Sequence, residues 1–290
     1  MKEEINGINY RLDEDNLTAE VIEKTYNRYM GDIMIPEIVV FDELTYRVES
    51  IGDMAFYECY SLTSITIPNS VKSIGRSAFS YCESLTSITI PDSITSIGEE
   101  TFLDCESLTS ITIPDGVTSI GDWAFAGCES LTSITIPKRV TSIGRNVFVR
   151  CSSLTSIVVE EGNTVYDSRK NCNAIIETRS NVLMYGCKTT IIPNSVEKIG
   201  YRAFAGCKSL TTIVVSDGVW LIDKQAFSDC ESLTSITIPE RVTIIGSRAF
   251  SHCESLTSIT FQGTVAQWET IVLYNGLDED IPVHCTDGDW

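Results

Sequence analysis

The sequence contains no apolar run long enough to cross a membrane. A membrane-spanning helix needs roughly 18 consecutive apolar residues, whereas the longest continuous runs, such as Ile38–Phe41, have the length of a strand. The chain begins with the polar residues Met1-Lys2-Glu3-Glu4, and no apolar stretch of a secretory signal follows them. We therefore expect no membrane span, and the protein is either cytosolic or has had an export signal removed from this sequence.

Basic residues are scarce relative to acidic ones. The chain has 21 Lys and Arg residues against 40 Asp and Glu residues, which gives a net charge of −19. Such a charge repels phosphate backbones and anionic lipid head groups. We therefore expect no nucleic-acid partner, and we look for partners among proteins.

The usual signatures of catalysis are also missing. Both histidines, His252 and His284, lack a neighbouring Cys or Asp at a known catalytic spacing. The serines lack the G-x-S-x-G nucleophile motif, and no phosphate-binding or dinucleotide-binding fingerprint is present. Adjacent carboxylates such as Glu99-Glu100 lie in predicted turns, where a solvated surface is the default. The sequence predicts no enzyme, and no catalytic, cofactor or metal site.

What the sequence does contain is one dominant repeat. The phrase Ser-Leu-Thr-Ser-Ile-Thr-Ile-Pro begins at Ser61 and returns 23 residues later at Ser84, and then again along the chain. A repeat of this size cannot bury its apolar face alone, so consecutive copies must stack. The pattern predicts an α/β repeat solenoid of about ten 23-residue coils, capped at both ends. The second apolar position of the predicted strand marks these coils at Ile35, Ile67, Ile90, Ile113, Ile136, Val159, Ile192, Val215, Ile238 and Phe261.

One coil shows how the repeat folds. Leu62, Ile65 and Ile67 alternate with polar residues, as in a half-buried strand. Pro68 ends this strand because it cannot donate a ladder hydrogen bond. A short second strand follows, and then a single helical or 3-10 turn that places Phe79 inside the coil.

Eight of the 11 cysteines keep the 23-residue step. Cysteines stacked in one ladder would be about 4.8 Å apart, which is longer than the Cβ separation of about 3.8 Å that a disulfide prefers. Zinc is disfavoured because ligands in a line cannot form a tetrahedron. We therefore expect buried free thiols at Cys59, Cys82, Cys105, Cys128, Cys151, Cys207, Cys230 and Cys253.

Both ends of the stack need protection from solvent and from strand pairing. Residues 1–32 predict an N-terminal cap hairpin, with strands at 8–12 and 18–22. The first coil carries nine extra residues, and we expect a second hairpin around residues 41–46.

The solenoid is predicted to cover residues 33–261, and residues 262–290 are predicted to form the C-terminal cap. A final strand is expected at 281–285. The preceding cap helix is predicted from the helical spacing of Val265, Trp268, Ile271 and Val272.

The second irregularity is an insertion at residues 160–188. It lacks the Ala-Phe-x-x-Cys turn and carries ten extra residues, which predict a hairpin with its tip at Arg179-Ser180. Cys172 and Cys187 flank this hairpin. Whether they form a disulfide depends on the strand register, which the sequence leaves open.

The repeat S-L-T-S-I-T-I-P-x-x-V-x-S-I-G-x-x-A-F-x-x-C resembles the BspA-type leucine-rich repeat of bacterial surface proteins. The resemblance covers about residues 33–261. It implies a leucine-rich-repeat solenoid at the cell surface or secreted, from which an export signal has been removed. Some members of the family bind host matrix or plasma proteins, and no functional residues are shared by the whole family.

Two surfaces are candidates for a partner. The outward strand positions form a ladder of hydroxyl groups, which suits a protein or a glycan, although strand propensity alone also favours Thr. Ice binding is disfavoured because serines form another row of the strand, and because Val158 and Val214 interrupt the threonine ladder. The insertion is the other candidate, because identical coils discriminate poorly between partners. The candidate residues are Thr66, Thr89, Thr112 and Thr135 on the ladder, and Tyr166, Arg169, Lys170, Arg179 and Tyr185 in the insertion.

Taken together, these features predict a non-catalytic protein-binding or adhesion module of a bacterial surface or secreted protein. Its expected partner is a protein, with host extracellular matrix and plasma proteins as candidates. A glycan-binding module and a structural spacer are the alternatives.

Overall fold

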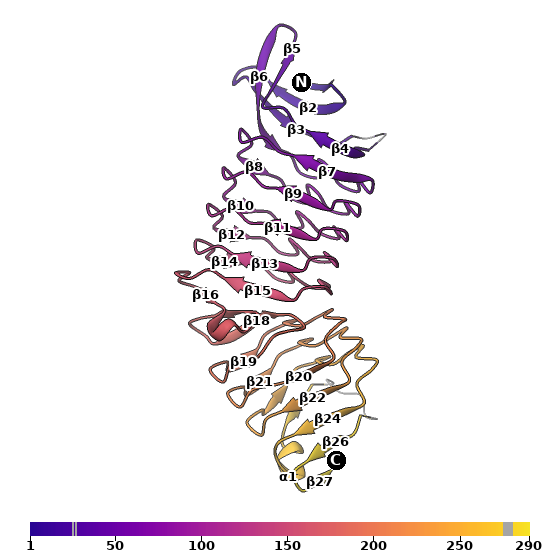
Figure 1. The fold of residues 1–290 in the computed structure, drawn as a ribbon, viewed down its shortest axis with the longest axis vertical. Helices are drawn as coiled ribbons and strands as arrows, with labels where there is room; N and C mark the ends of the chain where they lie inside the picture. The colour runs from indigo at the N-terminus through magenta and orange to yellow at the C-terminus, as the bar shows by residue number, and fades with distance from the viewer. Residues whose placement is uncertain (25, 27, 275–280) are drawn as a thin grey trace. The chain divides into compact units, whose positions relative to one another are not determined.

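The computed structural model describes residues 1–24, 26, 28–274 and 281–290. The chain divides into two compact units, Met1–Cys151 and Ser152–Trp290. Each unit is a stack of strand-rich coils with almost no helix (Figure 1). The predicted solenoid of 23-residue coils is therefore confirmed, although its helical content is much lower than the α/β description implies.

The N-terminal cap is a meander of three strands. Strands β2 (Ile8–Asp13) and β3 (Thr18–Val21) form the predicted antiparallel hairpin. Strand β1 (Lys2–Ile5), which the sequence analysis missed, pairs with β2 through a two-residue turn at Asn6-Gly7. Both turn residues have positive φ, 50° and 84°, which is the geometry that Asn-Gly favours in tight hairpins.

The extra residues of the first coil form the expected second hairpin. Strands β5 (Ile38–Phe41) and β6 (Leu44–Ile51) are antiparallel and turn at Asp42-Glu43. Strand β6 also pairs in parallel with β3. The hairpin thereby connects the cap to the stacked coils.

The coils of the first unit carry strands at two positions. The longer strands form a parallel sheet in the order β11-β9-β7-β4, and the shorter strands lie at the second position of each coil. The longer strands are β4 (Gly31–Met34), β7 (Leu62–Thr66), β9 (Ser87–Thr89), β11 (Ser110–Thr112) and β13 (Ser133–Ile136); the shorter ones are β8 (Ser73–Ile74), β10 (Ser96–Ile97), β12 (Ser119–Ile120) and β14 (Ser142–Ile143).

The predicted helical turns are absent from the described coils. After the second strand, the backbone forms consecutive tight turns in which Met54 and Glu58 have φ of 56° and 54°, values that a right-handed helix does not allow. The reason is that alternating conformations turn three N–H groups towards the next coil. Those of Met54, Phe56 and Glu58 donate to the carbonyls of Arg76, Ala78 and Ser80 at 2.8 to 2.9 Å.

The constant 23-residue spacing of the repeat Phe and Cys residues is explained by their contacts inside the coils. The rings of Phe79 and Phe102 are stacked with centroids 5.5 Å apart and an interplanar angle of 3°. Phe102 and Phe125 repeat this arrangement at 5.5 Å. Six of the eight repeat thiols also lie against the Phe carbonyl of the preceding coil, as in the 3.2 Å contact from Sγ of Cys105 to O of Phe79.

The second unit has the same construction around the insertion. Its two larger sheets have the orders β16-β17-β18-β19-β21-β23-β25 and β20-β22-β24-β26-β27. The strands are β15 (Ser156–Val159), β16 (Tyr166–Asp167), β17 (Ala174–Glu177), β18 (Val182–Gly186), β19 (Lys198–Ile199), β20 (Thr212–Val214), β21 (Leu221–Ile222), β22 (Ser235–Ile238), β23 (Ile244–Ile245), β24 (Ser258–Phe261), β25 (Val272–Leu273), β26 (Val283–Cys285) and β27 (Gly288–Asp289).

The C-terminal cap differs from the prediction in one respect. The helix α1 (Val265–Trp268) is a single turn, and Val272 belongs to strand β25. Trp268 is 1 % exposed and contacts Phe261 edge-on, with ring centroids 5.1 Å apart, so the cap does cover the last coil. Strand β26 provides the expected final strand, and β27 pairs with it in the antiparallel direction.

Removal of one ring from the phenylalanine ladder should destabilise the first unit strongly. Phe102 is fully buried between two other rings, so we expect Phe102→Ala to lower the free energy of unfolding by about 3–5 kcal/mol. The exposed Thr112→Ala is the control and should change it by less than about 0.5 kcal/mol. Denaturant unfolding followed by circular dichroism measures both. A loss below about 1 kcal/mol for Phe102→Ala would show that the ladder is not the core.

All 11 cysteines are free, including Cys172 and Cys187, and only Cys285 is more than marginally exposed. We therefore expect a thiol reagent to modify at most Cys285 in the native protein, and all 11 thiols after denaturation without a reductant. A count of nine in the denatured protein would contradict the free state of Cys172 and Cys187.

The buried thiols should make the protein less stable at alkaline pH. Burial raises the pKa of Cys59 to about 11 and that of Cys207 to about 12, whereas an unfolded thiol titrates near 8.5. The contribution of the buried thiols to the free energy of unfolding is therefore complete below about pH 8.5, and it is lost as the pH rises towards 11 and 12. Urea unfolding between pH 8 and 10.5 should show this decline, and Cys59→Ala should reduce its slope by at most about 1.4 kcal/mol per pH unit. A decline that is unchanged in the variant would contradict this origin.

Candidate binding surface on the strand face

The four ladder threonines of the first unit lie where the sequence predicts. Thr66, Thr89 and Thr112 are paired in register on neighbouring parallel strands, and Thr135 occupies the same position of β13. All four side chains are exposed. Among the described residues, none of these hydroxyl groups has a hydrogen-bond partner, so the row is available to a ligand.

A second row of threonines has a structural role that the sequence analysis missed. The hydroxyl of Thr86 donates to the carbonyl of Thr63 at 3.4 Å, and those of Thr109 and Thr132 repeat this bond at 3.3 Å. This row therefore ties each coil to the preceding one. The signal was present in the sequence, because each repeat has two threonines in its strand, and only one of them continues the exposed ladder.

Apolar side chains replace the hydroxyl side chains of the exposed ladder in part of the second unit. The residues at the ladder position there are Val158, Ile191 and Val214, with 42 %, 75 % and 64 % of their surfaces exposed. Hydroxyl side chains return at Thr237 and Thr260. Three consecutive coils of the second unit thus present large apolar side chains to solvent at this position, as Met34 does in the first coil, whereas the remaining coils present hydroxyls.

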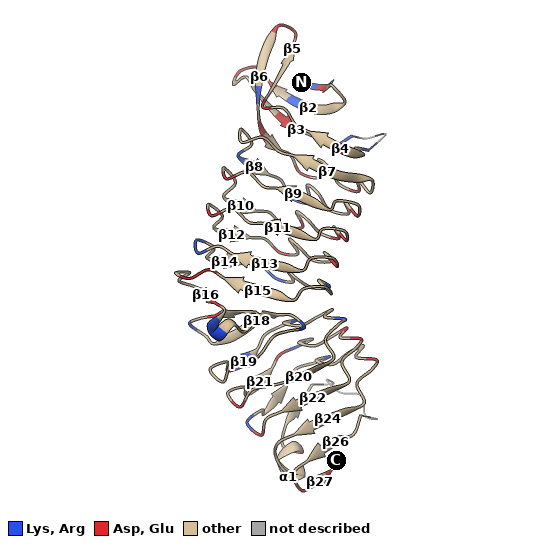
Figure 2. Ribbon diagram, viewed as in Figure 1, with Lys and Arg blue, Asp and Glu red and all other residues tan. Residues whose placement is uncertain are grey.

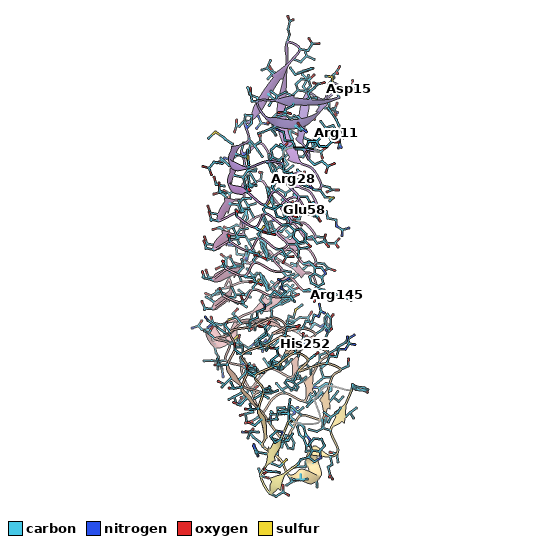
Figure 3. The ribbon with its side chains drawn as sticks, turned by 90° about the vertical axis from the view of Figure 1, so that its right-hand side faces the viewer. Arg11, Asp15, Arg28, Glu58, Arg145 and His252 are labelled. Atoms are coloured by element: carbon cyan, nitrogen blue, oxygen red, sulfur yellow. The ribbon has the colours of Figure 1, made fainter. Side chains whose placement is uncertain are left out.

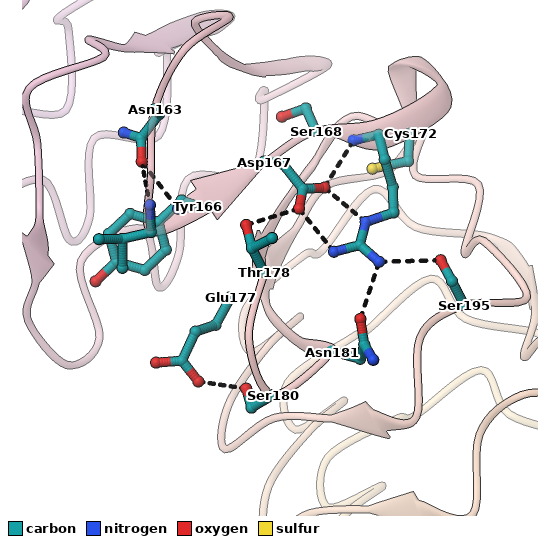
Figure 4. A network of polar contacts seen from close by, with 12 residues as sticks. Asn163, Tyr166, Asp167, Ser168, Cys172, Glu177, Thr178, Ser180, Asn181 and Ser195 are labelled. Atoms are coloured by element: carbon teal, nitrogen blue, oxygen red, sulfur yellow. Dashed lines mark hydrogen bonds and ion pairs between the residues drawn. The ribbon is translucent and has the colours of Figure 1, made fainter.

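The insertion is organised around one ion pair (Figure 4). The guanidinium of Arg169 donates from Nε and from one terminal nitrogen to the two carboxylate oxygens of Asp167, each at 2.7 Å. Its other terminal nitrogen donates to Asn181 at 2.9 Å and to Ser195 at 3.2 Å. Arg169 therefore holds strand β16, the hairpin β17–β18 and the following coil together.

The same contacts set the protonation of the pair. Partial burial raises the pKa of Asp167, but hydrogen bonds from Arg169 and Thr178 outweigh this effect and leave the pKa lowered. The hydrogen bond to Asp167 in turn raises the pKa of Arg169. Both groups are charged at neutral pH, so the contact is a bidentate ion pair of the strong type.

The five insertion residues do not form one surface. Tyr166 and Tyr185 are each only 5 % exposed, so their rings fill the interior of the insertion instead of contacting solvent. Arg169 is engaged in the ion pair just described. Only Lys170 and Arg179 are exposed. Of the five candidates, Lys170 and Arg179 are therefore the ones that a partner could reach on this surface, and their role in binding stays a prediction.

The described part of the strand face has a hollow at the break in the ladder. It measures about 510 Å³ and is lined by the segment from Thr190 to Ile192 and by β20, with Ile191 and Val214 among its walls. A second hollow of about 640 Å³ adjoins it at Asp217 and Gln262 and extends to Glu240 and Arg241. The first volume lies within the range of about 300–1,000 Å³ that is typical of ligand pockets.

The charged residues lie mostly in turns, and the strands of the coils contain few of them (Figure 2). Many charges pair across coils, as in the 2.9 Å contact between Arg28 and Glu58 near the N-terminal cap (Figure 3). No group of His, Cys, Asp or Glu side chains among the described residues could hold a metal ion. Within that same part of the chain, no helix is long and apolar enough to span a membrane.

The repeat structure and the sequence together define the family. The profile of the BspA type leucine rich repeat region matches residues 48–175 and 180–278 in six copies. The chain therefore belongs to the BspA-type leucine-rich repeat family.

Solved structures show the same architecture. A leucine-rich repeat protein from Bacteroides ovatus is 28 % identical with a TM-score of 0.62, covering 98 % of this chain and 71 % of its own. One from Eubacterium ventriosum is 24 % identical with a TM-score of 0.64, covering 88 % and 70 %. The pneumococcal vaccine antigen PcpA is 18 % identical with a TM-score of 0.50, covering 99 % of both chains. The last two show the fold alone. A search among curated proteins found no match.

Loss of the Asp167–Arg169 ion pair should loosen the insertion. Asp167→Asn leaves the guanidinium without its counter-charge, so we expect the free energy of unfolding of the second unit to fall by about 1–3 kcal/mol. Hydrogen exchange measured by mass spectrometry should accelerate in residues 160–188. Lys170→Ala is the control, since that side chain is exposed and its loss should cost less than about 0.5 kcal/mol. Equal effects of the two substitutions would contradict the structural role of the pair.

Proposed function

We propose that this chain is a non-catalytic protein-binding or adhesion module of a bacterial surface or secreted protein, and that the strand face of its coils is the binding surface. The observation that carries this proposal is the row formed by Thr66, Thr89, Thr112 and Thr135. These hydroxyls are exposed, are held in register by the ladder and make no internal hydrogen bond among the described residues.

Family membership supports the surface location, because the BspA-type repeat is a repeat of bacterial surface proteins. Rigidity supports the binding role. The hydroxyl positions are fixed by strands whose inner side is packed, so little side-chain or backbone freedom is lost when a partner binds. An extended partner could contact several coils at once and gain avidity from their repetition. Host extracellular-matrix and plasma proteins are the partners we expect.

The strand face can be tested by placing charges on it. The variant T66D/T89D/T112D/T135D replaces the hydroxyl row with four carboxylates. The control S73D/S96D/S119D/S142D adds the same number of charges to the short strands of the same unit, at positions that are exposed or half-buried. Both variants keep every inward-facing residue, so both should fold.

Binding is measured by biolayer interferometry against purified matrix and plasma proteins, with a glycan array in parallel. We expect at least one protein partner, a dissociation constant raised at least tenfold in the strand-face variant, and no change in the control. Binding to glycans alone, or the same loss in both variants, would contradict the proposal.

A further inference from the structure

The strand ladder of the second unit is interrupted on one side of β20. The N–H of Val215 donates to the carbonyl of Thr237 at 2.9 Å, and the N–H of Thr234 donates to the carbonyl of Thr211 at 2.8 Å. Alternate residues of a strand direct their main-chain groups to opposite sides. The odd-numbered residues of β20 therefore bond to β22, and Thr212 and Val214 direct their N–H and C=O groups away from it.

The coil that should pair with these groups does not do so. Its segment from Thr190 to Ile192 uses its N–H groups inside the insertion, where Thr190 donates to Cys187 at 3.0 Å and Ile191 to Cys172 at 3.1 Å. No main-chain hydrogen bond joins this segment to β20 within the described residues, and β20 pairs with β22 alone. The edge of β20 thus presents a row of unpaired donors and acceptors.

Strand β15, on the other side of the break, has side-chain hydrogen bonds along its edge. The N–H of Val159 in β15 donates to the hydroxyl of Ser168 at 2.9 Å, and the hydroxyl of Thr189 donates to the carbonyl of Thr155. Side chains of Ser168 in the insertion and of Thr189 directly after it therefore take the place of the missing strand at β15. Among the described residues, no side chain makes such a bond to the main chain of Thr212 or Val214 in β20, although an unpaired strand edge usually needs protection.

Apolar side chains accompany this open edge. Ile191 and Val214 are 75 % and 64 % exposed and line the hollow of about 510 Å³ in front of β20. An added strand would satisfy both features at once, because its main chain pairs with the edge while alternate side chains cover the apolar walls. A folded globular surface or a sugar would leave the main-chain row unpaired.

The charges of the groove indicate the side chains that suit it. The adjoining hollow, beyond the C-terminal ends of the strands, contains the carboxylates of Asp217 and Glu240 against the single guanidinium of Arg241. None of the three forms an ion pair with another described residue, so the net negative charge at this end remains available. A cationic side chain that follows the apolar residues of a bound strand would complement it.

We propose that the groove of the second unit, formed by the open edge of β20 with Ile191 and Val214, binds an extended segment of a partner protein. The segment adds as a strand to β20, covers the two apolar side chains with its own, and places Lys or Arg near Asp217 and Glu240. This inference rests on the proposed function and identifies the kind of partner segment that the site recognises.

The experiment uses the full chain and the synthetic probe acetyl-Thr-Val-Thr-Val-Lys-Lys-amide, with isothermal titration calorimetry. We expect saturable binding to the wild type and at least a tenfold weaker affinity for Val214→Asp, which places a charge on the apolar wall. The matched control, Val272→Asp, makes the same substitution at an exposed valine of the same unit, on β25 and outside the groove, and should leave the affinity unchanged.

Two further arms test the main chain and the charges. The lysines of the probe lie at the C-terminal end of β20, so the probe runs parallel to that strand, and its threonines, not the valines beside Val214, direct their N–H groups to it. A probe with N-methylated threonines keeps every side chain but cannot donate these hydrogen bonds, and it should bind at least tenfold more weakly. The D217K/E240K variant should reverse the charge preference and bind a probe ending in Glu-Glu more tightly than the lysine probe.

The inference is overturned if the probe shows no saturable binding, if N-methylation has no effect, or if Val214→Asp and Val272→Asp weaken binding equally. Concentration-dependent dimerisation that Val214→Asp abolishes, in the absence of probe binding, would assign the groove to a second copy and also overturns it. A matrix partner whose binding is insensitive to Val214→Asp would leave the proposed function standing and remove only this inference. Probe binding without any matrix or plasma partner would contradict the proposed function and leave the groove standing.

Discussion

The structure depends on the register between one coil and the next. In each unit, three N–H groups of a turn donate to the following coil where that coil is a regular one, so that Met54, Phe56 and Glu58 reach the carbonyls of Arg76, Ala78 and Ser80. The phenylalanine rings stack with the same 23-residue spacing, and thiols such as that of Cys105 lie against the Phe carbonyl of the preceding coil. A constant repeat of 23 residues keeps all these contacts equivalent. The outer face is a consequence of that register, because every outward side chain is held beside its counterpart in the neighbouring coil.

Much of the fold could be predicted because each of these contacts requires the same type of residue at the same position of every repeat. The inward positions of Phe79, Cys82 and Ile65 follow from periodicity, and each is buried. The turn conformation could not be predicted, since Ala-Phe suits a helical turn locally and only the neighbouring coil selects the alternating backbone. The C-terminal cap helix was too long in the prediction for a similar reason: Val272 pairs with Ile244 in a sheet that local spacing does not reveal.

The candidate site was predicted less well. The ladder threonines are exposed as expected, because a strand with one packed face fixes the direction of its side chains. The burial of the two insertion tyrosines could not be predicted from the repeat, since a segment outside the repeat must build its own interior. Tyr166 and Tyr185 fill that interior, and Arg169 ties its strands together through Asp167. The apolar break at Val158 and Val214 was visible in the sequence, but the open edge of β20 required the strand pairing.

The central claim is that the strand ladder is open at β20 and that this break, and not the uniform coils, distinguishes one partner from another. Residue-resolved hydrogen exchange of the unliganded protein tests it most directly. The amide of Val214 should exchange at nearly the rate of an unstructured chain, whereas the amide of Ile213 in the same strand and that of Thr237 in β22 should be protected by the ladder. Protection of Val214 equal to that of Ile213 and Thr237 would show that the edge is already paired, and would contradict the account.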